Sequence, residues 1–351
     1  MRKTSFLFLL QCVLSIQIHA QTTNKIDSII SVHKEDFDIP GISVGIVKND
    51  SVYFAKSYGL QNIETKVKVT NKTSFHSASV SKIFTAQGVL LLKERGKLNL
   101  DDLVITHIPE LKGRYQDFDD ITIRMLLNHS SGLGDIQNYH WKRNNISENS
   151  LQQYLMSANL KPKSTPGSVY NYSNLGYDLL GLLIAKISNS SFEDFMQKSV
   201  LEPNEMFDSD YRVFHIPDSI LASPHSKNKL TGNLYVRKTY PYTREHAPSS
   251  TLNTNVEDIN NWVLHYFQNQ NTLFAEMTTP SLESYPYIGL GFQLGSYRGY
   301  KTFGHLGGDK GFRSYLLLLP ELELGIIILA NSDYKEEFRT QIAKALIDHF
   351  L

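Results

Sequence analysis

The chain has 351 residues, and its 35 lysines and arginines balance its 35 aspartates and glutamates, so the formal net charge is +0. A balanced charge provides no long-range field to attract nucleic acid or an anionic membrane surface. Hydrophobic residues make up 41% and charged residues 20% of the chain, as in an ordinary globular protein. A chain of this length can bury a large core, and it can form one domain or two subdomains that share a cleft.

The first twenty residues have the pattern of a secretory signal peptide. Arg2 and Lys3 precede an apolar run from Phe6 to Ile18, and the small residue Ala20 follows. The alternative is a buried N-terminal helix, whereas a transmembrane span needs a longer apolar run. We therefore expect residues 1–20 to be removed and the protein to be secreted, with the periplasm as the expected compartment and the extracellular space as the alternative.

The only cysteine, Cys12, lies inside this predicted signal. A mature chain without cysteine has no disulfide, no thiolate nucleophile and no cysteine-ligated metal. We also expect no transmembrane segment in the mature chain, because no later apolar run is long enough to cross a bilayer.

Strands are predicted near both ends of the chain, and helices between them. After a helix at 22–36, two β-type runs at 41–47 and 52–57 flank a tight turn at Asn49-Asp50. Helices are then predicted at 80–92, 121–128 and 174–187, and Thr254-x-x-Glu257 has the spacing of a capping box before another helix. Further strands are expected at 288–294, 301–305, 313–319 and 324–330, and a closing helix at 334–350.

This order predicts an α+β fold. The terminal strands would pair in one antiparallel sheet flanked by the terminal helices, and the central helices would form an all-helical subdomain. We expect residues 21–351 to form one domain. Its α/β part would comprise about residues 21–78 and 275–351, and its helical part about residues 79–274. A site is expected in the cleft between the two parts.

The first candidate for chemistry is Ser79-Val80-Ser81-Lys82. Residues three apart share a helix face, so the Lys82 amine can reach the Ser79 hydroxyl and activate it as a nucleophile if burial lowers the lysine pKa. The Ser-x-x-Lys spacing occurs four times in the chain, and the other three are at Ser31, Ser226 and Ser332. Only Ser79 opens a long apolar helix, where a lysine is costly without a partner.

Two further segments carry polar groups suited to the same chemistry. In Tyr172-Ser173-Asn174, the tyrosine phenol can act as an acid or base, and the asparagine amide can contact the substrate or Lys82. The alternative is that the asparagine caps a helix and the tyrosine simply packs beside it. His305-Leu306-Gly307-Gly308 follows a predicted strand. Its glycines allow the backbone of a substrate to approach closely, and its backbone amides can face an oxyanion. The alternative is a β-bulge with a structural histidine.

In this order the segments resemble the superfamily of serine β-lactamases and penicillin-binding proteins, over nearly all of residues 22–351. The branch resembled includes class C β-lactamases, D-Ala-D-Ala carboxypeptidases, D-aminopeptidases and related esterases. The segments that carry the resemblance are Phe75–Ala86 (FHSASVSKIFTA), Leu126–Leu133 (LLNHSSGL), Pro166–Asn174 (PGSVYNYSN) and Phe303–Phe312 (FGHLGGDKGF).

The resemblance implies a β-lactamase/transpeptidase-like fold and a role for each site residue. It makes Ser79 the acylated nucleophile assisted by Lys82, and Tyr172 a general base or acid. It places the oxyanion between the backbone amides of Ser79 and Gly308, and substrate contacts at Asn174, His305 and Gly307. It implies no metal and no organic cofactor, and whether Lys82 or Tyr172 is the general base stays open.

The sequence departs from typical β-lactamases at the third segment. They place Lys-Thr-Gly or Lys-Ser-Gly where this chain has His305-Leu306-Gly307, and the missing lysine and hydroxyl help to bind a substrate carboxylate.

The expected function is a secreted serine hydrolase acting on an ester, a D-amino-acid peptide or amide, or a β-lactam. The alternative is a non-hydrolytic penicillin-binding-like protein that binds cell-wall peptide or forms a slow acyl adduct. The expected partner is a small-molecule or peptide substrate and not nucleic acid, and the oligomeric state stays open.

The aromatic run Tyr139-His140-Trp141 follows the Ser-Gly-Leu segment. These residues either wall the substrate pocket or simply pack within their loop.

Overall fold

The computed structural model describes residues 24–143, 145–269, 272–335 and 337–351. The predicted signal sequence and Cys12 lie outside this part of the chain. The chain divides into two compact units, residues 40–334 and the two terminal segments 1–39 and 335–351. Each unit is described by itself.

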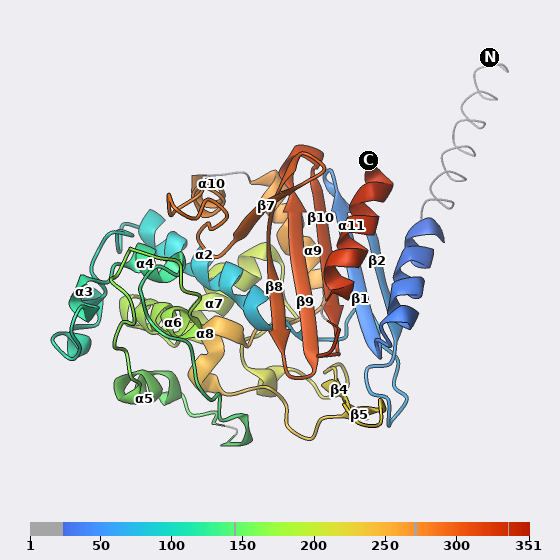
Figure 1. Ribbon diagram of the computed structural model, residues 1–351, viewed down its shortest axis with the longest axis horizontal. Coiled ribbons are helices and arrows are strands. Elements are labelled where there is room, and N and C mark those ends of the chain that lie inside the picture. Colours follow the sequence, from blue (N-terminus) through green and yellow to red (C-terminus); the bar gives the residue numbers. More distant parts are fainter. Residues whose placement is uncertain (1–23, 144, 270–271, 336) are drawn as a thin grey trace, which may run out of the picture. The chain divides into compact units, whose positions relative to one another are not determined.

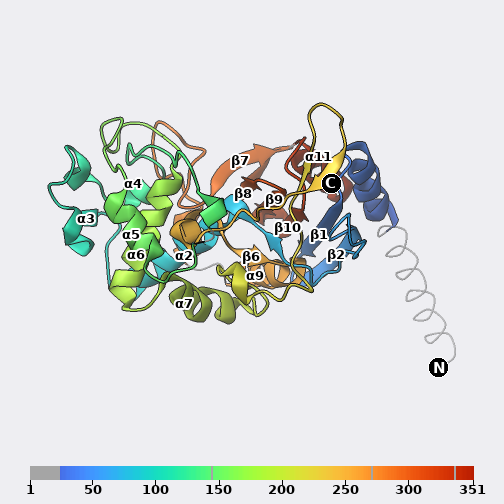
Figure 2. The same cartoon turned by 90° about the horizontal axis from the view of Figure 1, so that it is seen from below.

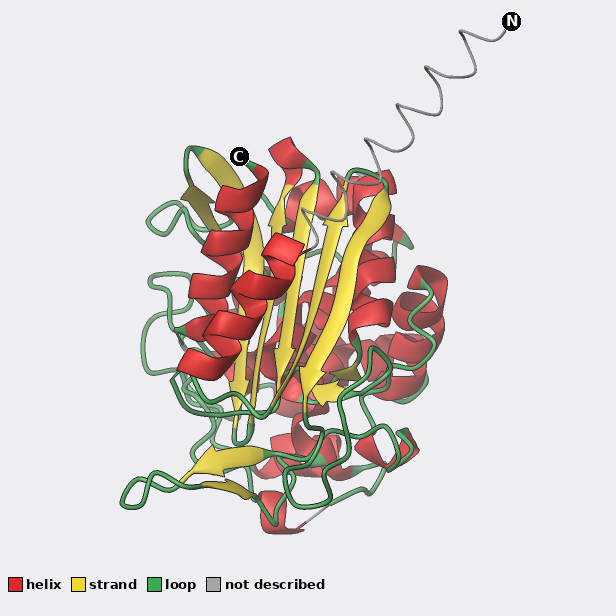
Figure 3. Cartoon of the chain, turned by 90° about the vertical axis from the view of Figure 1, so that its right-hand side faces the viewer, coloured by secondary structure: helices red, strands yellow, loops and turns green. Residues whose placement is uncertain are grey.

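The larger unit contains a six-stranded antiparallel sheet in the order β2-β1-β10-β9-β8-β7. Its strands are β1 (Gly41–Lys48), β2 (Ser51–Gly59), β7 (Gln293–Tyr297), β8 (Tyr300–Asp309), β9 (Phe312–Leu319) and β10 (Leu324–Ala330). Strand β1 pairs with β10, with Val44 opposite Ile328, so the two ends of this unit meet in the middle of the sheet (Figures 1 and 3). The prediction of an antiparallel sheet built from strands at both ends of the chain is confirmed.

Helix α9 (Val256–Gln268) packs against this sheet, and two strand glycines make the close approach possible. A Cβ at Gly45 would lie 2.8 Å from the Val256 side chain, and a Cβ at Gly325 would lie 2.4 Å from that of Val263. The helix thus lies against the sheet although its residues fall in the range 79–274. The predicted division into an α/β part and a helical part stays a prediction.

The remaining helices of this unit form a second layer of structure. Helices α3–α6 lie together at the end of the unit away from β1 and β2, and α2 lies between them and the sheet (Figures 1 and 2). The helices are α2 (Ser81–Glu94), α3 (Val104–His107), α4 (Ile123–Leu127), α5 (Ser150–Ser157), α6 (Asn174–Ser188), α7 (Phe192–Met196), α8 (Ala247–Ser250) and α10 (Thr272–Met277). Two short strand pairs, β3 (Phe75–His76) with β6 (Asn253–Thr254) and β4 (His225–Lys227) with β5 (Leu234–Val236), complete the unit.

Single turns connect these elements. Turns of 3-10 helix lie at Ala78–Val80, Pro109–Leu111, Phe118–Asp120, Trp141–Arg143, Glu202–Asn204, Val213–His215, Arg244–His246 and Pro320–Leu322, and a π-helical turn lies at Gln197–Leu201.

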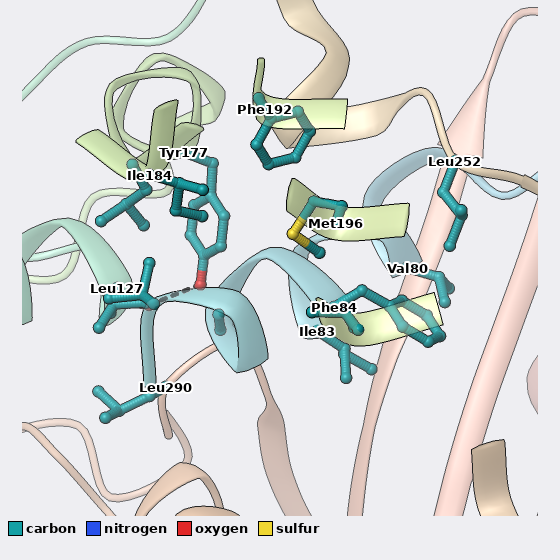
Figure 4. Close-up of a cluster of buried hydrophobic side chains, with 14 of the residues drawn as sticks. Val80, Ile83, Phe84, Leu127, Tyr177, Ile184, Phe192, Met196, Leu252 and Leu290 are labelled. Atoms are coloured by element: carbon teal, nitrogen blue, oxygen red, sulfur yellow. Dashed lines mark hydrogen bonds between the residues drawn. The ribbon is translucent and has the colours of Figure 1, made fainter. Parts of the chain in front are cut away.

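Helices α2 and α6 are buried over most of their length and form the centre of the helical core. Figure 4 shows Ile83 and Phe84 of α2 among apolar side chains from α6, α7 and the loop before β6. The one polar group drawn in this cluster, the Tyr177 hydroxyl, donates to the Leu127 carbonyl oxygen at 2.8 Å, so burying it leaves no unpaired hydroxyl (Figure 4). The packing fixes the start of α2 and the start of α6 relative to each other.

The smaller unit pairs a helix over residues 24–36 with α11 (Phe338–Phe350). Phe37 and Phe338 contact each other with ring centroids 6.1 Å apart, and Lys335 Nζ donates to the Asp36 carbonyl oxygen at 3.3 Å. Both predicted terminal helices are confirmed, although α11 begins at residue 338 and not at 334. In the described residues, no helix is both long and apolar enough to cross a membrane.

Further predicted boundaries are wrong in the larger unit. The strand expected at 288–294 begins only at Gln293, and Ile288 forms just an isolated bridge. The cause is Gly291, which has a φ of +81° where the chain crosses α2, and a Cβ there would lie 2.7 Å from the Ala86 Cβ. The N-cap of α9 is Asn255, whose side chain accepts from the Asp258 amide, one residue after the predicted Thr254.

Candidate active site

Ser79 lies on the 3-10 turn Ala78–Val80 that leads directly into α2. Ala78 has a φ of +48°, a left-handed conformation that costs energy for any residue with a Cβ. The turn is held from both sides, because the Ser77 amide donates to the Leu252 carbonyl oxygen at 2.9 Å and the Ser77 carbonyl oxygen accepts from Ser314 Oγ at 2.6 Å. These contacts fix a strained turn that presents the Ser79 hydroxyl at the start of a buried helix.

Lys82 lies one helical turn after Ser79, and its side chain is fully buried. Its ammonium donates to Ser79 Oγ at 3.1 Å, to Asn174 Oδ1 at 2.5 Å and to the Ser249 carbonyl oxygen at 2.6 Å. Burial lowers the pKa of Lys82 from 10.5 to about 7, against the opposing effect of the Asp178, Asp135 and Asp309 carboxylates. A lysine with this pKa exists partly as the neutral amine at neutral pH.

Tyr172 is the second side chain that contacts the Ser79 hydroxyl. Its hydroxyl donates to Ser79 Oγ at 2.8 Å, and its ring lies 5.1 Å from Lys82 Nζ, measured to the ring centroid. The ring also packs against His129, with centroids 4.4 Å apart. Burial raises the pKa of the Tyr172 phenol well above its ordinary value of 10, so the phenol stays protonated at neutral pH.

Asn174 connects Lys82 to Asp135. Its Oδ1 accepts from Lys82, and its Nδ2 donates to Asp135 Oδ1 at 3.0 Å. The helix cap is a different residue, since Ser173 Oγ accepts from the Gly176 amide at 3.0 Å. The side chain of Asn174 is therefore committed to holding Lys82, and the alternative of a capping asparagine is wrong.

Strand β8 brings the third predicted segment beside Ser79. The predicted strand end at His305 is wrong, because the β8–β9 ladder continues without a bulge as far as Asp309 opposite Phe312. Gly307 lies so close to the Ser79 turn that a Cβ would be 2.2 Å from the Ser77 carbonyl oxygen and 2.1 Å from Ser314 Oγ. Only glycine permits this approach.

The backbone of β8 also places one amide at the open edge of the sheet. Strand β7 pairs with β8 only as far as Gly304, and beyond it the Leu306 amide donates to the Gln293 side chain on the β7 side. Because amides two residues apart in a strand point the same way, the Gly308 amide points to this side as well. The side chain of His305 is buried, and its ring shares a hydrogen bond of 2.7 Å with the Leu306 carbonyl oxygen.

The structure brings together every site residue predicted from sequence, and it adds several that sequence reasoning missed. Asp135 and His129 flank the Ser-Gly-Leu segment, and a closer look at the polar residues around that motif would have found them. The Ser249 carbonyl oxygen has no sequence signal, because every residue has a backbone carbonyl oxygen.

A buried acid–histidine pair, also missed, lies one turn further along α6. Asp178 Oδ2 and His246 Nδ1 are 2.7 Å apart, and both side chains are fully buried. Burial raises the pKa of Asp178, although His246 opposes the shift. The pair joins α6 to the 3-10 turn that leads to Ser249, the residue whose carbonyl oxygen holds Lys82.

A cavity of about 550 Å³ opens beyond Gly308. Tyr139 and Trp141 form part of its wall, whereas His140 does not line it. That these aromatic residues wall the substrate pocket stays a prediction. No group of three or more His, Cys, Asp or Glu side chains that could hold a metal ion is found among the described residues.

Known proteins are similar to this chain in sequence, and solved structures are similar to it in fold. Protein flp of Staphylococcus aureus strain COL is 29% identical over 349 residues, which cover 93% of this chain and 66% of that protein. A β-lactamase of Providencia stuartii is 27% identical over 369 residues, covering 93% of this chain and 91% of the relative. The chain thus spans about two thirds of the length of the flp proteins that it matches.

Two solved structures superpose closely on this one. The octameric penicillin-binding protein homologue from Pyrococcus abyssi has a TM-score of 0.82 and 26% identity, and the match covers 93% of this chain and 77% of that one. A class C β-lactamase has a TM-score of 0.77 over 94% of this chain and 96% of its own, at 22% identity, which shows a shared fold. The sequence itself matches the protein family described as Beta-lactamase over residues 26–349. The chain therefore belongs to the β-lactamase family.

Proposed function

We propose that this protein is a serine hydrolase that forms an acyl-enzyme at Ser79. The observation that carries the proposal is that one hydroxyl, Ser79 Oγ, lies 3.1 Å from the Lys82 amine and 2.8 Å from the Tyr172 phenol. A serine becomes an effective nucleophile when a base can take its proton and an acid can protonate the leaving group.

Lys82 is the base in the first step. Its amine is partly neutral at pH 7, whereas Tyr172 is held as the protonated phenol. The neutral amine takes the Ser79 proton as Oγ attacks the substrate carbonyl carbon. The carbonyl oxygen becomes an oxyanion, for which the proposed donors are the amides of Ser79 and Gly308. The open strand edge at Gly308 supports this assignment.

Tyr172 is the acid in the second step. As the tetrahedral intermediate collapses, the bond to the leaving atom breaks and the phenol gives that atom its proton. The Lys82 ammonium then returns a proton to the phenolate, so the proton taken from Ser79 ends on the leaving group. Water repeats the sequence on the acyl-enzyme. It loses a proton to Lys82, attacks the acyl carbon and releases a carboxylic acid, and Ser79 regains its proton.

The proposed substrates are esters and D-amino-acid peptides or amides, in preference to β-lactams. The position that in typical β-lactamases supplies a lysine and a hydroxyl holds His305 and Leu306 here, and Leu306 offers no hydroxyl. The His305 ring is already engaged with the Leu306 carbonyl oxygen, and Asn174 and Gly307 remain the proposed contacts to the acyl side of the substrate. The pattern of residues 1–20 supports export to the periplasm as part of the same proposal.

A substrate panel tests the proposal on purified protein. The panel contains p-nitrophenyl acetate, nitrocefin, a D-Ala-D-Ala peptide and a D-amino-acid amide, each compared with the Ser79→Ala protein. We expect turnover of at least the ester or a D-amino-acid substrate, and its loss in Ser79→Ala. Turnover that survives in Ser79→Ala would refute the site. A stable adduct at Ser79 that never releases free enzyme would refute hydrolysis and favour the binding protein.

A further inference from the structure

The cavity beyond Gly308 adjoins the strand that carries one of the proposed oxyanion donors. Gly308 and Asp309 of β8 line one wall, and Asp309 bonds to His76, three residues before Ser79, at 3.1 Å. Tyr172, the proposed donor to the leaving atom, does not line the cavity; its ring is flanked by His129 and His305. In the proposed mechanism the leaving group departs on the side of Tyr172, which leaves this cavity for the part of the substrate that stays on Ser79.

The carboxylates around the cavity already have donors. Asp309 is bonded to His76, and Asp333 accepts from Ser226 Oγ at 2.6 Å and from the Gly311 amide at 2.9 Å. Both carboxylates are therefore hydrogen-bonded within the protein itself.

The cations around the cavity are held differently. Lys310 lies in the turn between β8 and β9, is exposed, and places its ammonium 5.5 Å from the centroid of the Trp141 ring. Among the described residues, its ammonium forms no ion pair. The guanidinium of Arg313 donates to the Asp309, Phe312 and Asp333 carbonyl oxygens, which fix its position in the wall. The cation available to a ligand that enters the cavity is therefore the Lys310 ammonium.

Flat aromatic walls complete the cavity. The rings of Tyr139 and Trp141 stack with centroids 5.2 Å apart and planes 22° apart. Burial raises the pKa of Tyr139 well above its usual value, so this wall carries no charge of its own. The volume of about 550 Å³ suits a small ligand, and uncharged ring faces suit a short methylene chain.

We propose that this cavity binds the acyl part of the substrate and that Lys310 pairs there with a carboxylate at the far end of the acyl chain. The substrate class is thus an ester or amide of a short dicarboxylic or similarly anionic acid. The inference rests on the proposed function, because it places the acyl group relative to Ser79.

The experiment compares two p-nitrophenyl esters of equal chain length, the hydrogen glutarate and the valerate. We expect a higher kcat/KM for the glutarate, and we expect Lys310→Ala to lower the glutarate-to-valerate ratio about fivefold, the scale of one exposed ion pair. Lys310→Arg keeps most of the preference, and rising salt weakens it. Lys112→Ala removes an exposed lysine outside the cavity and serves as the matched control with an unchanged ratio.

A second arm tests the side of the site. The ester 4-acetoxybenzoate carries its carboxylate on the leaving group, so Lys310→Ala should not change its ratio to p-nitrophenyl acetate. An unchanged glutarate preference in Lys310→Ala, or a loss confined to 4-acetoxybenzoate, would overturn the assignment.

Binding without turnover separates this inference from the proposed function. Calorimetric titration of Ser79→Ala with the two esters should show tighter glutarate binding that disappears in the Ser79→Ala/Lys310→Ala protein. If wild-type protein hydrolyses neither these esters nor any substrate of the panel, the proposed function fails and the titration still decides the subsite. If it hydrolyses valerate and the titration shows no glutarate preference, only the subsite fails.

Discussion

At the scale of single residues, the site depends on a cation buried among neutral acceptors. The three groups that accept from Lys82 are a hydroxyl, a side-chain amide and a backbone carbonyl, and none of them carries a full negative charge. The nearest carboxylates act from further away and only partly offset the loss of water. This arrangement makes the neutral amine accessible at neutral pH, which is what a base requires.

The pH dependence of turnover follows from this pKa. Below pH 7 the Lys82 ammonium cannot accept the Ser79 proton, whereas above it the neutral amine can. We expect kcat/KM for p-nitrophenyl acetate to rise with pH through a single ionisation near 7, because the pKa of Lys82 in the folded protein is about 7. Lys82→Arg should lack this rise and lose roughly a hundredfold or more in rate, since a guanidinium stays protonated. A flat profile between pH 6 and 9 would contradict the assignment.

Tyr172 should matter to rate more than to binding. Tyr172→Phe removes the proposed acid but keeps the ring that packs on His129, so we expect kcat to fall about 10²- to 10⁴-fold with a smaller change in KM. Tyr170→Phe is the matched control, because the Tyr170 ring packs against Tyr285 and Tyr287 and the proposed mechanism gives its hydroxyl no role. Steady-state kinetics of ester hydrolysis measure both, and equal losses in the two variants would argue against a specific role for Tyr172.

The sequence allowed the nucleophile to be chosen among four Ser-x-x-Lys pairs, because burial follows from the apolar pattern of α2. In the structure Lys82 is fully buried, whereas Lys229 and Lys335 are exposed. The Ser249 carbonyl oxygen could not be predicted. It lies 167 residues from Lys82, and a backbone acceptor leaves no trace in residue type.

At the scale of elements, the site depends on how closely β8 and α6 approach the start of α2. Gly307 permits the approach of β8, and the capped start of α6 delivers Tyr172 and Asn174. Sequence patterns placed all three elements, but they ended β8 too early. Glycines are poor strand formers, and only pairing with β9 keeps Gly307 and Gly308 in the ladder.

Substituting Gly307 should damage the site more than the fold. In Gly307→Ala the added methyl group meets the Ser77 carbonyl oxygen and Ser314 Oγ, so β8 must move away from the Ser79 turn. We expect at least a tenfold loss of kcat/KM, because the rate of catalysis falls steeply when catalytic groups are displaced from their positions. Gly295→Ala in β7 is the control, since its Cβ meets only Thr302 Oγ1 at 3.1 Å, a side-chain atom that can move. Ester kinetics and thermal unfolding of both variants check this, and full activity in Gly307→Ala would contradict it.

The buried Asp178–His246 pair should be a major contributor to stability. Asp178→Asn removes the charge that pairs with His246 inside the protein, and breaking a buried pair costs about 3–5 kcal/mol. Glu110→Gln is the comparison, because its bond to Lys186 lies at the surface and should cost under about 1 kcal/mol. Urea unfolding measures both free energies. A loss in Asp178→Asn as small as that in Glu110→Gln would show that the pair adds little.

At the scale of the whole molecule, the order of strands joins distant parts of the chain. Strand β1 pairs with β2 and with β10, so the hairpin at residues 41–59 joins the rest of the sheet only through residues 324–330. The sequence predicted this closure because strand patterns occur at both ends with helices between them. It did not predict the place of α9 against the sheet, since an amphipathic helix can cover either helices or strands.

Folding should therefore be slow, and the site should form together with the sheet. Contacts between residues so far apart in sequence close slowly. Trp262 is fully buried on α9, where its indole donates to the Gln87 side chain of α2 at 2.9 Å, and the chain has only one other tryptophan, Trp141. In a Trp141→Phe protein refolding from urea, we expect ester hydrolysis to return at the same rate as the Trp262 fluorescence. Activity that returns before the fluorescence would show that the site forms before α9 packs in place.

The most direct test of the central claim is covalent labelling of Ser79. The protein is treated with a fluorophosphonate, and the intact mass and the modified peptide are measured by mass spectrometry beside a control serine hydrolase. The account predicts one added phosphonyl group, located on Ser79, and none in the Ser79→Ala protein. An unmodified Ser79 under conditions that label the control, or a label on another residue, would contradict it.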